Sequence, residues 1–263
     1  MRLDREKMLT HCKDGDERVL LARALDRAEI VLRSGLTQVT DFYDPYHTGR
    51  IISTVRAVSG LTATPDGGCP GAERVRVAVH AAGIQPVVED YDFGFISIKG
   101  NFKMTGVTHR DFLGSLLGLG LRREKFGDIF VVEEGARVVV AGEVTSYILA
   151  NLNKVGRIHV SVTEITDEAF QPPEHAYKEI RATVASMRLD AVASAGFGTS
   201  RSKIVREIEA DRFSVNWRVS PDPSTPVQEG DILSARGRGR LKVAEVKGPL
   251  KSGRIGILLK KFI

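Results

Sequence analysis

The sequence predicts an α+β protein in three parts: a helical N-terminal region (1–80), a mixed middle domain (81–168) and a basic C-terminal domain (181–263), with a linker at 169–180. Apolar residues recur at helical spacing in the first part, and strand-like and helix-like stretches alternate in the second. The third part holds 16 Lys and Arg against 8 Asp and Glu, whereas residues 1–180 hold 22 against 25. This positive excess suggests a polyanionic partner; a solubilising surface is the alternative.

The N-terminal region contains one clear helical pattern and one weaker one. Arg18 to Leu36 carries a broad apolar face with charged residues between, and Gly35 is a typical stop signal. A second helix is expected from about Pro45 to Gly60. Thr64 to Gly71 is dense in Pro, Asp and Gly, which predicts a loop.

The middle domain shows an ordered alternation of strand and helix patterns. Strands are expected at 93–98, 129–132, 137–140 and 158–162, and helices at 110–117 and 143–152. Glu133-Glu134-Gly135 separates the second and third strands as a hairpin turn. The order β-α-β-β-α-β predicts a ferredoxin-like fold, which supports RNA binding and many other functions.

Composition excludes several classes of protein. The longest apolar run is far shorter than the roughly 20 residues that span a bilayer, and the first seven residues carry charges of both signs with no signal-peptide pattern after them. Cys12 and Cys69 are too few and too far apart for a disulfide framework or a zinc knuckle. We therefore expect a cytoplasmic protein with no membrane insertion, no metal and no small-molecule cofactor.

The C-terminal domain places cations at two positions suited to phosphate. After the linker pattern Phe170 to His175, a helical stretch is broken by Gly196 and Gly198, and Ser200 is placed to cap a second helix reaching about Asp211. Arg201 and Lys203 lie in the first turn of that helix, where free N–H groups and the helix dipole favour an anion, and Arg206 is expected near solvent. A strand is expected at 213–217. Further on, Arg236-Gly237-Arg238-Gly239-Arg240 projects three cations from one short span.

These residues resemble a known RNA-binding module. Arg188-Leu189-Asp190, then Ser200-Arg201, Val215-Asn216, Gly230-Asp231 and the Arg-Gly-Arg-Gly-Arg run together resemble an S4 (αL-type) RNA-binding domain. Such domains grip structured RNA mostly through backbone and shape. The stretches His109 to Gly120 and Arg122 to Ile129 are similar to the middle domain of the bacterial YlmH family, and the similarity extends over nearly the whole chain.

Membership of that family implies a non-catalytic protein that binds rRNA and tRNA on the large ribosomal subunit and acts in the rescue of stalled nascent chains. The family is also linked to cell division, and a photosynthetic branch is named for photosystem II. Carried onto this chain, the candidate RNA-binding residues are Arg188, Ser200, Arg201, Lys203, Arg206, Asn216, Arg236, Arg238 and Arg240. Arg122, Arg123 and Lys125 form a candidate secondary contact with RNA or the ribosome.

Two other functional classes remain open, and some individual residues have ordinary structural alternatives. Arg188-Leu189-Asp190 resembles the catalytic motif of pseudouridine synthases, but only 73 residues follow Asp190, too few for a catalytic domain around it; the other class is a protein-interaction adaptor in cell division or photosystem assembly. Asn216 is typical of a turn that bonds its own backbone. Trp217 could stack on a base or lie in the core. Asp190 is expected to orient an arginine, because a carboxylate repels phosphate. No catalytic residue is predicted.

Overall fold

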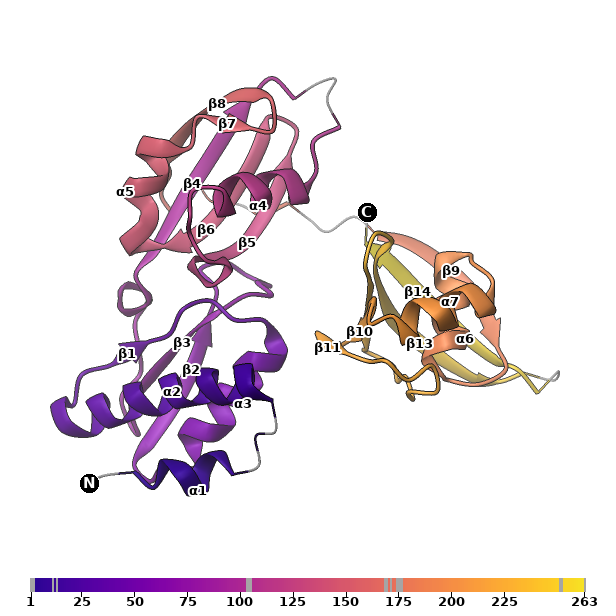
Figure 1. Cartoon of the computed structure of the whole chain (residues 1–263), viewed down its shortest axis with the longest axis horizontal. Coiled ribbons are helices and arrows are strands. Elements are labelled where there is room, and N and C mark those ends of the chain that lie inside the picture. The colour runs from indigo at the N-terminus through magenta and orange to yellow at the C-terminus, as the bar shows by residue number, and fades with distance from the viewer. Residues whose placement is uncertain are drawn as a thin grey trace. The chain divides into compact units, whose positions relative to one another are not determined.

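The computed structural model describes residues 3–10, 12, 14–102, 106–167, 170, 172–173, 177–250 and 253–262. The chain forms two compact units, Met1–Pro173 and Glu174–Ile263 (Figure 1). The predicted linker, 169–180, falls partly outside the described residues, and its last four residues belong to a strand of the second unit, described below.

The first unit begins with three helices: α1 (Arg5–Leu9), α2 (Gly15–Ser34) and α3 (Pro45–Arg56). The carboxylate of Asp14 caps α2 by accepting from the N–H groups of Asp16 and Glu17. Gly35 ends the helix in the left-handed region, at φ 71°, and its N–H donates to the carbonyl of Val31. Both predicted N-terminal helices are therefore confirmed.

A three-stranded sheet that the sequence did not predict packs with these helices. Its strands are β1 (Gln38–Val39), β2 (Leu61–Asp66) and β3 (Arg76–Ala81), in the order β1-β3-β2. The predicted loop at Thr64 is wrong for its first three residues, because Thr64 to Asp66 end strand β2 and pair with β3. Strand β2 lies at the sheet edge, where a proline such as Pro65 is tolerated because one side of the strand needs no ladder hydrogen bond.

The rest of the first unit has the predicted ferredoxin-like topology. Its elements are the 3₁₀ helices η1 (Val88–Tyr91) and η2 (Arg123–Lys125), the strands β4 (Phe93–Gly100), β5 (Phe126–Val132), β6 (Gly135–Ala141), β7 (Lys154–Val155) and β8 (Ile158–Glu164), and the helices α4 (His109–Leu117) and α5 (Gly142–Asn151). The antiparallel sheet has the order β5-β6-β4-β8-β7. The first four give the split βαβ arrangement expected from the sequence.

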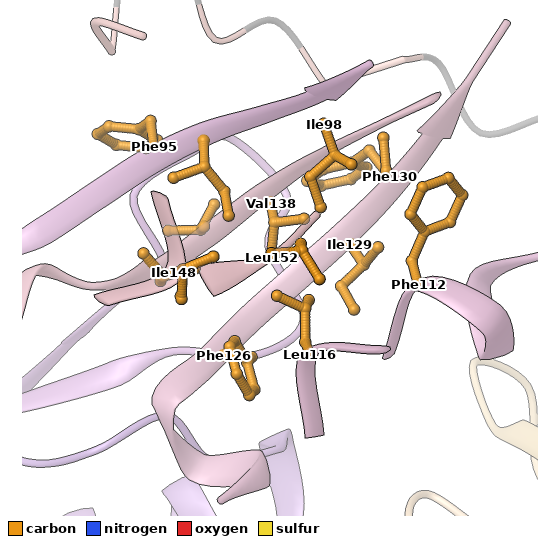
Figure 2. Close-up of a cluster of buried hydrophobic side chains, with 14 of the residues drawn as sticks. Phe95, Ile98, Phe112, Leu116, Phe126, Ile129, Phe130, Val138, Ile148 and Leu152 are labelled. Atoms are coloured by element: carbon orange, nitrogen blue, oxygen red, sulfur yellow. The ribbon is translucent and has the colours of Figure 1, made fainter. Parts of the chain in front are cut away.

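The core of this sheet forms where both helices cover it. Phe112 and Leu116 of α4, and Ile148 of α5, pack against strand side chains such as Ile98 and Val138 (Figure 2). Thr108 and Asp111 start α4 with a capping box in which the Asp111 carboxylate accepts from the Thr108 N–H at 2.8 Å. Phe42 of the N-terminal region is fully buried in the same core, which joins the two parts of the first unit.

The second unit is a six-stranded sheet with two helices on one face. Its elements are β9 (Tyr177–Val184), α6 (Leu189–Phe197), α7 (Arg201–Glu209), β10 (Phe213–Val215), β11 (Arg218–Val219), β12 (Ile232–Ala235), β13 (Gly239–Pro249) and β14 (Ile255–Phe262). The strand order is β11-β10-β12-β13-β14-β9, and β9 pairs with β14 along its whole length. The helices bury Leu189, Val192, Ile204 and Ile208 against Leu241, Val243, Ile257 and Leu259 of the sheet.

The break between the two helices lies one glycine later than the sequence suggested. Gly196 is inside α6, and the helix ends at Gly198, which has φ 60° and closes the turn with its N–H on the Ser194 carbonyl. A Cβ on Gly196 would lie 2.3 Å from Cδ1 of Leu241. Gly196 is therefore used for close packing of α6 on the sheet, and Gly198 for the change of direction.

Candidate nucleic-acid interface

The two helices of the second unit are joined at their N-terminal ends by one carboxylate. Asp190, in the first turn of α6, is 3% exposed and accepts hydrogen bonds from Arg188 and Arg201. The Arg201 Nε and Nη2 atoms lie 3.0 and 2.8 Å from Asp190 Oδ2, and Arg188 reaches both carboxylate oxygens at 3.3 Å. Burial by itself raises the pKa of Asp190, but hydrogen bonds from Arg188 and Arg201 outweigh it and hold the pKa below its usual range.

This arrangement fixes two guanidinium groups at the place where α6 and α7 begin. The Arg201 side chain remains 52% exposed and that of Arg188 43% exposed. Two cations share one carboxylate, so a positive charge remains at the surface. The expectation that Asp190 orients an arginine is confirmed by these contacts.

Helix α7 presents its other cations away from the core. Ile204 and Ile208 are fully buried, whereas Lys203 and Arg206, three residues apart, are exposed on the opposite side. Ser200 is the N-cap residue, as predicted, but its Oγ lies 3.5 Å from the Ser202 Oγ and makes no capping bond. The helix N–H groups in this first turn are therefore not covered by the Ser200 hydroxyl.

A second ion pair holds the Arg-Gly-Arg-Gly-Arg turn against α7. Arg238 donates from Nε and Nη2 to the two carboxylate oxygens of Glu207, both at 2.8 Å, and from Nη1 to the Thr199 Oγ1 at 2.9 Å. The hydrogen bond from Arg238 lowers the pKa of Glu207, and the charges of Arg212 and Lys203 lower it further. Arg238 is thus committed to a bidentate contact inside the protein, and it positions the turn.

Arg212 extends this group of cations, although the sequence analysis did not select it. The Arg236 N–H donates to the Arg212 carbonyl at 2.9 Å, and the Arg212 guanidinium reaches back to the Arg236 carbonyl at 3.4 Å, passing close to Gly237. We call Lys203, Arg206, Arg212, Arg236 and Arg238 the basic cluster. Arg212 directly precedes strand β10 in the sequence. Because Phe213 of β10 pairs with Ala235 of β12, Arg212 lies beside Arg236, and this register is known only from the structure.

Arg240 lies on the other face of the sheet. Leu241 and Val243 point into the core below α6 and α7, so the alternation of β13 directs Arg240 and Lys242 away from the helices. The Arg240 guanidinium lies 4.4 Å from the ring centroid of Phe262, a cation–π contact. Arg240 is therefore separated from the basic cluster by the thickness of the sheet.

Asn216 and Trp217 form the two-residue turn between β10 and β11. The predicted strand is shorter than expected, because it ends at Val215 and both turn residues have positive φ, 48° and 65°. The Asn216 side chain donates to Asp231 Oδ1 at 2.8 Å and accepts from the Ile232 N–H at 2.9 Å. Asn216 thus ties the hairpin to β12. Trp217 is half-buried at the hairpin tip and is absent from the described core cluster.

The candidate secondary contact lies in the first unit, around η2, and its three residues differ in environment. Lys125 is held by the carboxylates of Asp41 and Glu143, each 2.5 Å from its Nζ. Arg123 is half-buried and donates to the carbonyls of Phe126 and Gly127. Arg122 is 57% exposed, with Asp41 at 3.9 Å. Of the three, Arg122 presents the most open cation.

No group of three or more His, Cys, Asp or Glu side chains is arranged to hold a metal ion within the described ranges. Among the helices in the described part of the chain, none is both long and apolar enough to cross a membrane.

Comparison with known proteins gives matches along nearly the whole chain. Residues 16–84 match the family model described as "YlmH, N-terminal", residues 86–169 match "Putative RNA-binding domain in YlmH", and residues 187–233 match "S4 domain". The S4 match contains Arg188, Arg201, Lys203 and Arg206 and ends before the Arg236 turn.

Two individual proteins are similar to this chain. The ribosome-associated protein quality control protein P2 of Bacillus subtilis is 33% identical over 239 residues, which cover 91% of this chain and 93% of the relative. The solved structure of the cell division protein ylmH from Streptococcus pneumoniae matches with a TM-score of 0.51 at 27% identity, over 60% of this chain and 96% of that one. With three matching domain models and a relative of nearly equal length, the chain belongs to the YlmH family of S4-domain proteins.

Proposed function

We propose that this protein is a non-catalytic RNA-binding protein whose second unit holds structured RNA, rRNA or tRNA, on the large ribosomal subunit. Its physiological role is the rescue of stalled nascent chains; the name of the Bacillus relative, a ribosome-associated protein quality control protein, supports a role at the ribosome. The S4 match and the putative RNA-binding domain support RNA as the partner. RNA modification and an adaptor function in cell division or photosystem assembly are the alternatives that the experiments below distinguish.

The observation that carries the proposal is that the second unit presents two groups of cations: the basic cluster, and the pair Arg188 and Arg201 on Asp190 at the start of α6 and α7. Each contains more cations than carboxylates: Arg188 and Arg201 share Asp190, and Lys203, Arg212 and Arg238 lie near Glu207. The ion pairs with Asp190 restrict the Arg188 and Arg201 side chains before RNA arrives. These two side chains therefore lose little conformational entropy on binding a phosphate backbone.

The structure changes which of the predicted residues we expect to touch phosphate. Lys203, Arg206 and Arg236 make no ion pair within the described ranges, so they are the leading contacts, together with the exposed sides of Arg188 and Arg201. Arg238 acts as a positioning residue through Glu207. Asn216 fixes the hairpin that carries Trp217. The Ser200 hydroxyl makes no capping bond and leaves the N–H groups of Arg201 and Ser202 available to an anion.

The salt dependence of RNA binding tests this surface. About five neutralised phosphates give a log–log slope of roughly −3 to −5. Replacing both Lys203 and Arg206 by Ala is expected to weaken binding of ribosomal RNA by at least about tenfold at 0.1 M salt and to flatten the slope by about 1 to 2. Lys247→Ala is the matched control, because Lys247 is an exposed cation near the far end of β13. An unchanged slope in the double variant would show that this surface is not the RNA site.

A second experiment addresses the ribosomal target. Cross-linking in cells, followed by sequencing of the attached RNA, is expected to recover large-subunit rRNA together with tRNA, and the Lys203/Arg206 double variant should lose both. Mass analysis of that RNA should show no modification that depends on the protein. Recovery of small-subunit rRNA alone, or a protein-dependent modified nucleotide, would contradict the proposal.

A further inference from the structure

A pocket of about 490 Å³ lies in the first unit. It is lined by the start of α2, the segment leading into α3 and the loop at η2. Four arginines reach it: Arg23, Arg74, Arg122 and Arg123, which we call the arginine pocket. Its volume is in the range of sites for small ligands.

Two of these guanidinium groups are half-buried and lack a carboxylate partner. Arg74 donates from Nε to the Phe126 carbonyl at 3.0 Å and from Nη2 to the Phe42 carbonyl at 2.7 Å. Arg123 donates from Nη1 to the same Phe126 carbonyl at 2.6 Å. The two cations thus converge on one carbonyl oxygen, and neither forms an ion pair with any residue that the structure describes.

Both guanidinium groups are partly desolvated, while the charges of Asp44, Asp128 and Glu124 favour their protonated forms. Burial, together with the charge of the neighbouring Arg74, lowers the pKa of Arg123 to about 10. Burial likewise lowers the pKa of Arg74. Two like charges held together in a partly desolvated place favour an anion between them. The remaining N–H groups of both side chains are donors in the fork geometry that matches phosphate oxygens.

The rest of the lining limits which anion fits. Asp16, Asp44 and Glu124 also face the pocket, and Asp44 is held by His47 with 2.8 Å between Oδ2 and Nδ1. These carboxylates oppose a polyanion, but they can accept hydrogen bonds from ribose hydroxyls or an exocyclic amine. Val19, Leu20 and the ring of Tyr43 supply apolar surface suited to a base. The lining therefore suits one phosphate attached to a neutral, hydrogen-bonding and flat group.

We propose that the arginine pocket binds a single nucleotide, with its phosphate on Arg74 and Arg123 and its nucleoside beside Tyr43, Val19 and the three carboxylates. The nucleotide is either free or the 5′-phosphorylated end of an RNA chain. This site is separate from the proposed S4 interface, since none of its residues belongs to the second unit.

Titration of the full-length protein with adenosine 5′-monophosphate, inorganic phosphate and adenosine tests the site. NMR signals of the Arg74 and Arg123 Nε–H groups are expected to shift with the nucleotide and with phosphate, and to stay unchanged with adenosine. The nucleotide should bind at least about tenfold more tightly than phosphate, because only it uses the nucleoside side of the pocket. No shift with the nucleotide, or equal affinity for phosphate, would overturn the proposal.

Variants at exposed positions avoid disturbing the buried arginines. Replacing both Arg23 and Arg122 by Gln should weaken nucleotide binding about tenfold, since each removes a cation from the rim. Arg56→Gln is the control: the same substitution, removing one charge, at an exposed position at the end of α3 and outside the pocket. Equal affinities in the double variant and the control would reject the site.

The source of the nucleotide is resolved with a short RNA. A tetranucleotide with a 5′-phosphate that shifts the same Arg signals identifies an RNA end, whereas binding of the mononucleotide alone identifies a free nucleotide. Because none of these measurements involves Lys203 or Arg206, a negative result here leaves the S4 interface untouched, and failure of the S4 variants leaves this pocket untouched.

Discussion

Arg238 and Glu207 face each other across the junction of α7 and the β12–β13 turn, joined by two hydrogen bonds of 2.8 Å. Because of this pair, Arg238 holds the Arg-Gly-Arg-Gly-Arg turn against α7, as a clamp, instead of presenting a free cation to solvent. Arg236, two residues before it and bonded to Arg212 through the backbone, keeps an exposed side chain. Alternate arginines of one run therefore have different functions.

Loss of the Arg238–Glu207 ion pair should lower the stability of the second unit. Arg238→Ala and Glu207→Gln are each expected to lower the free energy of unfolding of the second unit by about 1 kcal/mol, the upper part of the range for solvent-screened pairs. Urea denaturation measures the change, with Lys247→Ala as the surface-charge control. If either variant unfolds at the wild-type midpoint, the clamp contributes nothing.

Asp190 should make stability depend on acid pH. Its pKa in the folded protein is lowered, so the stabilisation is present above its unfolded value of 3.8 and is lost as the pH falls through the folded value. The difference in unfolding free energy between wild type and Asp190→Asn should therefore be constant from about pH 5 to 8 and shrink below the reference pKa of about 4. Urea titrations across this range measure it. A constant difference down to pH 2.5 would contradict the proposed linkage.

Trp217 occupies a left-handed backbone position that glycine adopts more easily. Trp217→Gly should relieve about 1 kcal/mol of backbone strain, and the second position of this type of turn favours Gly after Asn. If the ring stacks on a base, the same variant should bind RNA several-fold more weakly while unfolding at higher urea. Asn216→Gly is the contrasting variant, because it removes two side-chain hydrogen bonds and should lower stability. Unchanged RNA affinity in Trp217→Gly would assign the ring no RNA contact.

Gly196 should tolerate no larger residue. An added Cβ would lie 2.3 Å from Leu241 Cδ1 and 2.8 Å from Leu259 Cδ1, so Gly196→Ala should destabilise the second unit by about 1 to 3 kcal/mol despite the higher helix propensity of Ala. Gly114→Ala in α4 meets nothing within 4 Å and should stabilise the first unit by up to about 1 kcal/mol. Thermal unfolding of both variants checks the contrast; equal shifts would show that the close packing of α6 is not as described.

The sequence by itself predicted the ferredoxin-like order of the middle domain, because alternating apolar runs of β4, β5, β6 and β8 reflect burial of one sheet, and helical spacing in α4 and α5 reflects the face that covers it. It also predicted the positions of α2, α3 and α7 and the cations of α7, since periodicity and charge are local properties. The end of strand β2 was not predicted, because its Pro and Asp residues are typical of a turn and only the edge position of the strand accounts for them.

Only the tertiary structure decided which cations stay available. Arg238 meets Glu207 across 31 residues, Arg212 meets the Arg236 turn through strand register, and Arg240 leaves the cluster because β13 alternates. Arg74 and Arg123 converge on Phe126 although 49 residues separate them in the chain. The sequence gives the charge of each residue. The electrostatic field at a surface, however, depends on the distances between residues that are far apart in the chain, and folding sets those distances.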